Sequence, residues 1–339
     1  MTNQPITTDS LRAELASAPG ADEGSRAAAA ERAAQILRPT GAMQRLDEVA
    51  VHMAAWLRTP TPAVERPAAV IFAADHGVAA DGVSAYPTEV TGAMLAAFQA
   101  RKASVSALAE VAGATVTAID VGVGNPTGNL RHEPALDPQR FAAAFDAGRA
   151  SVAELDTDLL ILGEMGIGNT TAAAAVTAAL LGGDHDVFVG RGTGLDDAAL
   201  ATKAGVVGEA LARIAGVSDP LEILREVGGA ELVAIAGAMT EARLRSIPVL
   251  LDGYIASAPA LALHVIDPMF VANALAGHAS AEPGHARVLA ALARQPLLTL
   301  DLRLGEASGA MAAVPLVKMA CKLLTDVPTF PEWFGPAED

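Results

Sequence analysis

One stretch of the sequence, residues 159–176, constrains the fold more than any other. It reads LLILGEMGIGNTTAAAAV, which is four apolar residues, a Gly-Glu pair, a glycine-rich turn and an alanine-rich segment of high helix propensity. This order predicts a buried strand, a tight turn and the first turn of a helix. Free main-chain N–H groups at such a helix start bind anions, and Gly166 and Gly168 let a phosphate approach the main chain. The stretch therefore predicts a phosphate site in an α/β fold.

The same stretch differs from the P-loop of nucleoside-triphosphate enzymes at one position. Residues 163–170 follow the pattern G-x-x-x-x-G-K-[ST], except that Asn169 replaces the lysine. That lysine reaches the β- and γ-phosphates, so its absence argues against a triphosphate ligand. We expect a ligand that carries a single phosphate.

A second stretch repeats the arrangement near the C-terminus. Leu304-Gly305-Glu306 follows an apolar run and precedes a helix-like segment, as Leu162-Gly163-Glu164 does. Open α/β sheets bind ligands beyond the carboxyl ends of their strands, so we expect Glu164 and Glu306 to face one crevice. Our hypothesis is that one of them acts as a general base. The alternative is that each glutamate caps the helix that follows it, because acidic side chains are favoured at helix starts.

Apolar runs and helix-like segments alternate along most of the chain. This pattern indicates an α/β fold with a Rossmann-like, mainly parallel sheet covered by helices on both faces. Strands are predicted by apolar or β-branched runs at residues 68–74, 115–121, 159–162, 187–189, 248–251, 269–276 and 296–304. Helices are predicted over residues 25–37, 88–99, 138–155, 229–245 and 254–264.

A proline-rich segment, residues 58–67, predicts a domain boundary. We expect a small helical subdomain from residues 1–66 and 326–339, and a Rossmann-like catalytic domain from residues 67–325. The aromatic side chains of the tail, Phe330, Trp333 and Phe334, are expected to dock on the N-terminal helices.

Composition and charge narrow the classes of partner. The 39 acidic and 23 basic residues give a net charge of −16, which repels nucleic acid and anionic membrane surfaces. No segment is predicted to span a membrane, because the most apolar long one contains Asp252 and Pro259. A single cysteine, Cys321, cannot form an intrachain disulfide, so we expect a cytoplasmic location and a buried, inert thiol.

Motifs of several other enzyme classes are missing from the sequence. Asp75-His76, residues 184–186 and the pair His278 and His285 do not have the spacing of zinc ligands, so we expect no metal and no cofactor. There is no G-x-S-x-G elbow and no strict G-x-G-x-x-G. An acyl-transfer hydrolase and a nicotinamide oxidoreductase therefore have little support.

Long blocks of the chain are similar to one known family. In order between residues 41 and 322 they read GAMQRLDEVAV, FAADHGVAADGVSAYPTEVT, GEMGIGNTTAAAAV, GRGTGLDD, LDGYIASAPALAL, GHASAEPGH and LRLGEASGAMAAVPLVKMA. They resemble the nicotinate-nucleotide:dimethylbenzimidazole phosphoribosyltransferases, which assemble the lower ligand of cobalamin. The resemblance implies a homodimer that transfers phosphoribose from nicotinate mononucleotide to 5,6-dimethylbenzimidazole, releasing nicotinate and giving α-ribazole 5′-phosphate.

The resemblance also implies roles for individual residues. Glu306 matches the catalytic base and Glu164 the second acidic position. Contacts with phosphate and ribose are implied for Gly166, Ile167, Gly168, Asn169, Thr170, Gly192, Lys203 and Ser280. Contacts with the aromatic base are implied for Ser84, Tyr86, Met94 and Leu304. Lys203 would supply the positive charge that Asn169 lacks.

Two alternatives stay open for the same site. Met94 stands where some members have a polar residue that contacts the base, and some relatives accept other azoles, purines or phenols. The same transfer to a different aromatic base is therefore one alternative. The other is a catalytically silent protein that binds nicotinate mononucleotide.

Overall fold

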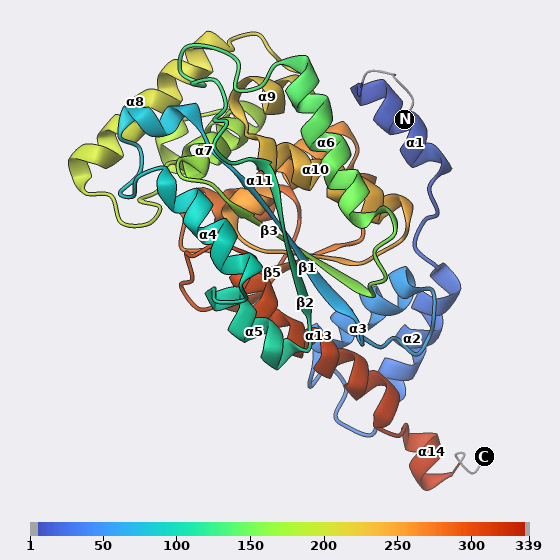
Figure 1. Ribbon diagram of the computed structural model, residues 1–339. Helices are drawn as coiled ribbons and strands as arrows, with labels where there is room; N and C mark the ends of the chain where they lie inside the picture. The colour runs from blue at the N-terminus through green and yellow to red at the C-terminus, as the bar shows by residue number, and fades with distance from the viewer. Residues whose placement is uncertain (1–5, 336–339) are drawn as a thin grey trace.

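The computed structural model describes residues 6–335 and contains one parallel sheet of six strands (Figure 1). The spatial order is β2-β1-β3-β4-β5-β6. The strands are β1 (Pro67–Ala74), β2 (Thr115–Gly122), β3 (Leu159–Met165), β4 (Val249–Leu251), β5 (Ala274–Ala279) and β6 (Pro296–Thr299). The prediction of a parallel, Rossmann-like α/β fold is confirmed.

The strand order reverses direction at β1. The chain moves from β1 to β2 on one side and then crosses to β3 on the other, with Phe72 of β1 aligned with Glu164 of β3. At such a switch point the connections leave in opposite directions, which opens a crevice at the carboxyl ends of the two strands. Glu164 therefore lies beside this crevice because of the topology.

Helices cover both faces of the sheet, as predicted. Longer helices that pack on the sheet or on one another are α3 (Gln44–Leu57), α6 (Pro138–Ala153), α7 (Asn169–Leu181), α8 (Asp197–Arg213), α10 (Ala230–Leu244), α11 (Tyr254–Ile266) and α13 (Ser308–Asp326). The other helices are α1 (Thr8–Ser17), α2 (Glu23–Gln35), α4 (Glu89–Gln99), α5 (Ser104–Ala112), α9 (Pro220–Val227), α12 (Pro283–Ala291) and α14 (Phe330–Phe334). Short 3-10 turns are η1 (Gly77–Asp81), η2 (His185–Phe188) and η3 (Pro268–Val271).

Alternate side chains of each central strand enter two separate cores. Val70 and Phe72 of β1 pack with α6, α7, α10 and α11 on one face, whereas Ala69 and Ile71 pack with α3, α5 and α13 on the other. All eight residues of β1 are buried, as expected for a strand covered on both faces. The uniformly apolar runs in the sequence therefore mark the centre of the sheet.

The N-terminal helices lie in two different places (Figure 1). Leu11 and Leu15 of α1 belong to the same core as α10, while α2 and α3 contact α13 on the other face. The C-terminal tail joins α2 through the Arg32–Glu332 ion pair at 2.7 Å. The proposed division into residues 1–66 with 326–339 and residues 67–325 stays a prediction, and its ends, residues 1–5 and 336–339, lie outside the described residues.

The aromatic tail does not dock as predicted. Phe330, Trp333 and Phe334 are 45%, 65% and 72% exposed. A main-chain bridge between Ile36 and Thr329, together with the Arg32–Glu332 pair, holds the tail instead. Polar and main-chain bonds thus make the contact that the aromatic rings were expected to make.

Three predicted strands differ in the structure. Residues 187–189 belong to η2 and its end, because β4 pairs directly with β3 and leaves no place for a strand between them. The strand predicted at 269–276 is β5, which begins at Ala274 after η3. The strand predicted at 296–304 ends at Thr299, so a loop of residues 300–305 separates β6 from Glu306.

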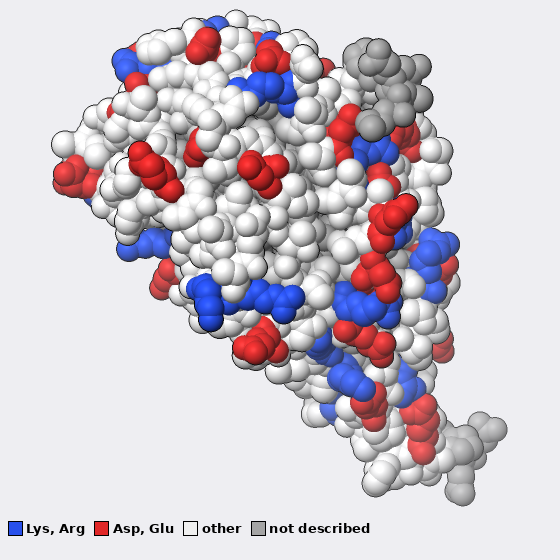
Figure 2. Space-filling model, viewed as in Figure 1, with Lys and Arg blue, Asp and Glu red and all other residues white. Residues whose placement is uncertain are grey.

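Among the described helices, α13 alone has the length and apolar composition of a membrane span, and 56% of its window is buried inside the protein. Its packing against both β5 and α3 is that of a core helix. Figure 2 shows basic and acidic side chains interspersed over one face, with neighbours of opposite sign along the edge formed by α2 and α3. Ion pairs such as Arg45–Glu48 and Arg26–Glu23 lie on these helices.

Candidate active site

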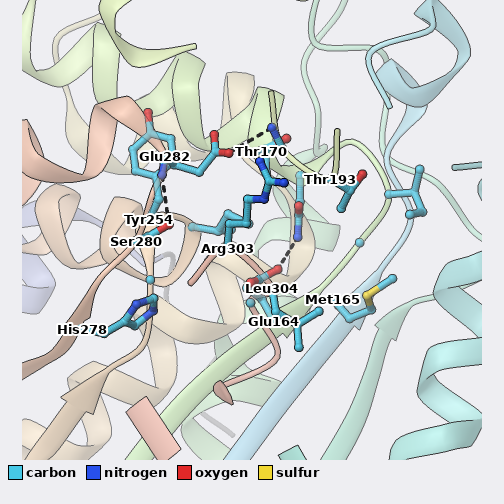
Figure 3. Close-up of a pocket in the computed structure, with 17 residues that line it drawn as sticks. Glu164, Met165, Thr170, Thr193, Tyr254, His278, Ser280, Glu282, Arg303 and Leu304 are labelled. Carbon is cyan, nitrogen blue, oxygen red and sulfur yellow. Dashed lines mark hydrogen bonds between the residues drawn. The ribbon is translucent and has the colours of Figure 1, made fainter. Parts of the chain in front are cut away.

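A pocket lies at the carboxyl ends of β3, β4 and β5 (Figure 3). It is lined by Glu164, Met165, Gly166, Ile167, Asn169, Thr170, Gly192, Thr193, Gly253, Tyr254, Ile255, His278, Ser280, Glu282, Arg303, Leu304 and Gly305. The space open to a water-sized molecule is about 80 Å³, so the pocket is narrow in this conformation. Its position is the one that the topology of a parallel sheet favours for ligands.

Glu164 is buried at the end of β3, with 4% of its surface exposed. The side-chain amide of Asn169 donates a hydrogen bond to its carboxyl group. Burial raises the pKa of Glu164 well above 4.5, and the charges of Asp252, Glu231 and Glu306 raise it further. These surroundings therefore favour the protonated form of Glu164.

Glu306 immediately precedes Ala307, the N-cap residue of α13, and it does not line the pocket, although residues 303–305 do. The preceding Gly305 approaches Glu164 so closely that a Cβ atom added to it would be 2.5 Å from Oε1 of Glu164. Glu306 is 6% exposed, and within residues 6–335 no hydrogen bond holds its carboxyl group. Burial, and then the charge of Asp252, raises the pKa of Glu306 to about 7. Gly305 thus places the main chain that leads to Glu306 against Glu164, and burial raises the pKa of both carboxyl groups.

Asp252 holds the N-terminus of α13, which begins two residues after Glu306. It follows β4, is 1% exposed, and its Oδ1 accepts the main-chain N–H of Ala310 in α13 at 2.8 Å. Nε2 of His278 lies 3.6 Å from the same oxygen. Burial raises the pKa of Asp252, whereas His278 and the main-chain amides of α13 lower it. Because Glu306 has a left-handed conformation, φ 62°, the capped helix helps to hold it in place.

Glycine-rich turns form the opposite wall. Gly168, with φ 98°, leads into α7, whose first residue is Asn169. The main-chain amide of Ile167 donates to Oγ1 of Thr91 at 3.2 Å, and that of Asn169 donates to the carbonyl of Gly166 at 3.1 Å. Two amides predicted to face a phosphate are therefore already bonded within the protein.

Lys203 of α8 lies directly behind this wall. Its Nζ donates to Oγ1 of Thr170 at 2.8 Å and to the carbonyl of Gly190 at 2.9 Å, and the side chain is fully buried. Burial lowers the pKa of Lys203 to about 8, while the charge of Glu282 acts to raise it. A cation that is mostly protonated at neutral pH therefore supports the glycine-rich turns.

Comparison with known proteins identifies the family. A family model described as phosphoribosyltransferase matches residues 18–333. The chain belongs to the phosphoribosyltransferase family. It is 46% identical over 323 residues to a nicotinate-nucleotide–dimethylbenzimidazole phosphoribosyltransferase of Cereibacter sphaeroides, covering 95% of each chain. A Methylorubrum extorquens protein of the same name is 44% identical over 326 residues, covering 96% of this chain and 95% of its own.

A solved structure has the same fold. The crystal structure of nicotinate-nucleotide–dimethylbenzimidazole phosphoribosyltransferase from Thermus thermophilus matches with a TM-score of 0.88 and 40% identity. The match covers 94% of this chain and all of that one. The family resemblance stated from the sequence is confirmed by both comparisons.

Most residues that the family resemblance implied for phosphate and ribose line the pocket of this phosphoribosyltransferase. They are Gly166, Ile167, Asn169, Thr170, Gly192 and Ser280. Gly168 lines a smaller hollow of about 40 Å³ on the other side of the same turn, and Lys203 lies behind Thr170. Asn169 bonds Glu164, so its side chain is directed to the carboxyl cluster.

Ser280 is held by a buried histidine of the GHASAEPGH block. The main-chain amide of Ser280 donates to Nδ1 of His285 at 2.9 Å. Burial lowers the pKa of His285 to about 3, so the ring is neutral and its proton lies on Nε2, 3.2 Å from Oγ of Ser257. Hydrogen bonding explains this histidine without a metal.

The residues implied for the aromatic base are not gathered in one place. Leu304 lines the pocket, Ser84 lines the small hollow with Gly168, and Tyr86 lines a separate hollow of about 700 Å³. The main-chain amide of Tyr86 donates to Oγ of Ser84 at 3.2 Å, a tight turn that separates the two side chains. Met94 packs against the core on the α13 face and lines none of these hollows.

Several pocket residues were not predicted, namely Met165, Tyr254, His278, Glu282 and Arg303. Asp252-Gly253 and Gly277-His278 follow apolar runs in the sequence, so their places at strand ends were a usable signal. Arg303 is exposed on the pocket wall, and within residues 6–335 its guanidinium forms no ion pair (Figure 3). It offers a positive charge to an anionic ligand.

Proposed function

We propose that this chain transfers phosphoribose from nicotinate mononucleotide to 5,6-dimethylbenzimidazole and releases nicotinate. The observation that supports this most strongly is the buried carboxyl group of Glu306, which directly follows the pocket residues 303–305 without lining the pocket itself, while the opposite wall of the pocket is built from glycine-rich turns. The relatives that carry this enzyme name align over almost the whole chain. The product would be the α-ribazole 5′-phosphate that becomes the lower ligand of cobalamin.

The reaction exchanges one carbon–nitrogen bond for another. A ring nitrogen of the benzimidazole attacks the anomeric carbon of the ribose from the face opposite the nicotinate. The bond to the pyridinium nitrogen breaks, and its electron pair stays on nicotinate, which leaves as a neutral ring. The other nitrogen of the benzimidazole becomes acidic as it attacks, and its proton passes to the carboxylate of Glu306.

The two buried carboxyl groups suit different roles. A general base is most effective when its pKa lies near the working pH, and the pKa of Glu306 is raised to about 7. The pKa of Glu164 is raised well above its usual value, because burial and the charges around it disfavour ionisation. Glu306 would therefore accept the proton, and Glu164, whose protonated form is favoured by its surroundings, would offer a hydrogen bond. Environments that separate two pKa values in this way are typical of acid and base pairs.

The other half of the pocket suits a phosphate monoester. Lys203 places its charge behind Thr170, and Ser280 contributes a hydroxyl group on the adjacent wall. The guanidinium of Arg303 is free to pair with an anion such as the phosphate or the nicotinate carboxylate. These groups supply positive charge and donors without a P-loop lysine.

The direct test is turnover of nicotinate mononucleotide with dimethylbenzimidazole, measured as nicotinate release by chromatography and as product mass. We expect Glu306→Gln to lower kcat by at least about two orders of magnitude, because the variant has no group to take the proton. The matched control is Glu154→Gln, an exposed glutamate on the C-terminal cap of α6. Full activity in Glu306→Gln would remove this residue from the mechanism.

The acceptor needs a separate measurement. Of the four residues implied for the aromatic base, only Leu304 lines the pocket. The lining of the pocket therefore does not favour one aromatic acceptor over another. A screen of benzimidazoles, purines and phenols, with products identified by mass spectrometry, separates transfer to dimethylbenzimidazole from transfer to another base. Binding of nicotinate mononucleotide by calorimetry without turnover of any acceptor would instead support the silent binding protein.

We also propose that the enzyme acts as a homodimer in the cytoplasm. The exposed apolar side chains Met319, Trp333 and Phe334 favour burial against another surface. Light scattering after size exclusion should give twice the mass of 34.3 kDa. A monomer at micromolar concentration would contradict the proposal.

A further inference from the structure

A carboxylate lies in the half of the pocket that should receive a phosphate. Glu282 is 8% exposed and lines the pocket beside Ser280 (Figure 3). Its Oε1 accepts the main-chain N–H of Gly192 at 2.9 Å. Two like charges at short range in a partly buried site repel each other, so this carboxylate works against phosphate binding. The position of Glu282 in this half of the pocket therefore indicates a role other than direct contact with the phosphate.

Glu282 connects two loops that come from distant parts of the sequence. It caps α12, its main-chain amide donates to Oγ of Ser280 at 3.2 Å, and its side chain reaches Gly192. Ser280 and Gly192 are both implied phosphate contacts. Through these hydrogen bonds Glu282 connects the pocket wall that contains Ser280 with the wall that contains Gly192.

The loop of residues 190–194 is shaped around this side chain. A Cβ atom on Gly190 would lie 2.0 Å from Oε2 of Glu282, so only glycine allows the main chain to pack there. Gly192 and Gly194 have φ values of 52° and 125°, which cost most other residues free energy. The loop conformation therefore depends on contacts from outside the loop.

Two charged side chains supply those contacts from opposite elements. Lys203 of α8 donates to the carbonyl of Gly190 at 2.9 Å, and Glu282 accepts from the amide of Gly192 at 2.9 Å. Lys203 thus binds a main-chain acceptor at residue 190, and Glu282 binds a main-chain donor at residue 192. The two hydrogen bonds together therefore hold the loop on both sides of Arg191.

We propose that Glu282 is a positioning residue, which holds the 190–194 loop in the conformation that receives the phosphate of the mononucleotide. It acts as a hydrogen-bond acceptor for Gly192, and its negative charge is not needed for this role. The inference rests on the proposed function for the identity of the phosphate ligand. It predicts that a neutral acceptor of the same shape can replace the carboxylate.

The test compares Glu282→Gln, which keeps an acceptor oxygen, with Glu282→Ala, which removes it. We expect Glu282→Ala to raise the KM and the calorimetric Kd for nicotinate mononucleotide about tenfold, the loss of one hydrogen bond that leaves the amide of Gly192 without its acceptor, with kcat within about threefold of wild type. Glu282→Gln should return both constants to within about threefold of wild type or below it. Glu154→Ala on an exposed site is the matched control.

A second measurement does not depend on catalysis. Amide hydrogen exchange in residues 190–195 should be faster in Glu282→Ala than in wild type, and Glu282→Gln should restore protection, with unchanged circular dichroism in both variants. Wild-type constants and exchange in Glu282→Ala would overturn the inference. A Glu282→Gln protein as defective as Glu282→Ala would also overturn it, because the charge would then be required. Failure of the wild type to bind or turn over the mononucleotide would count against the proposed function, while exchange would still decide the role of Glu282.

Discussion

Replacing Glu306 by glutamine is expected to stabilise the protein at alkaline pH while removing most of its activity. The carboxyl group of Glu306 is buried next to Asp252, and both effects raise its pKa from 4.5 to about 7. Glutamine has nearly the same shape and does not ionise. The variant should therefore avoid the free-energy cost of placing a charge in this site.

The direction of the pH effect on stability follows from which state, the folded protein or the unfolded chain, keeps the proton on Glu306. Between pH 4.5 and about 7 the folded protein keeps a proton on Glu306 that the unfolded chain has already released. The free energy of unfolding of the wild type must then fall as the pH rises through this window. At about 1.4 kcal/mol for each pKa unit, the step from 4.5 to about 7 amounts to at most about 3 kcal/mol.

The assay is urea unfolding of both proteins, followed by circular dichroism at a series of pH values. We expect the stability difference, Glu306→Gln minus wild type, to change little below about pH 4.5 and to grow by about 2–3 kcal/mol by about pH 8. Glu164 and Asp252 are present in both proteins, so the part of their contributions that does not depend on the charge of Glu306 cancels in the difference. Glu154→Gln should show no such growth, since that site is exposed.

A difference that stays constant with pH, or that shrinks as the pH rises, would refute the reasoning. It would mean that Glu306 ionises as freely in the folded protein as in the unfolded chain. The assignment of Glu306 as a base working near neutral pH would then lose its physical support.

Three further predictions concern activity. The wild-type kcat/KM should fall about tenfold for each pH unit below about 7, where Glu306 becomes protonated, and a pH profile without this limb would contradict the role of the base. Asp252→Asn should move that limb to lower pH, because it removes the charge that raises the pKa of Glu306; a limb that stays in place or moves upward would show that Asp252 is neutral in the working enzyme. Lys203→Met should raise the KM for nicotinate mononucleotide by at least about tenfold, and the wild-type KM should rise above about pH 8, where Lys203 loses its proton; an unchanged KM would place the phosphate elsewhere.

The sequence was sufficient to predict the parallel sheet and the place of Glu164 at the end of a central strand. Strand β1 and residues 159–162 of β3 are uniformly apolar because both faces are covered, and the carboxyl ends of parallel strands lie at one edge of the sheet. The same argument placed Glu306 at the end of a strand, but β6 ends at Thr299 and a loop of residues 300–305 leads to Glu306. That Glu306 and Glu164 face one crevice stays a prediction.

Features that depend on loop conformation or on long-range polar contacts could not be predicted. Ser84 and Tyr86 are two residues apart, yet a tight turn directs them into different hollows. Asp252 and Glu282 act through partners 58 and 90 residues away, so no local pattern indicates their roles. The polar helix α1 was missed because it has few apolar residues to mark a buried face.

The narrow pocket has a consequence for how substrate enters. Residues 303–305 form part of its wall and continue directly into Glu306, so widening the mouth for a mononucleotide would also move the main chain that carries the base. Water that reaches an open pocket would then find no group in place to activate it. Coupling the entry of substrate to the position of Glu306 would protect nicotinate mononucleotide from hydrolysis until the aromatic acceptor has displaced water from the pocket.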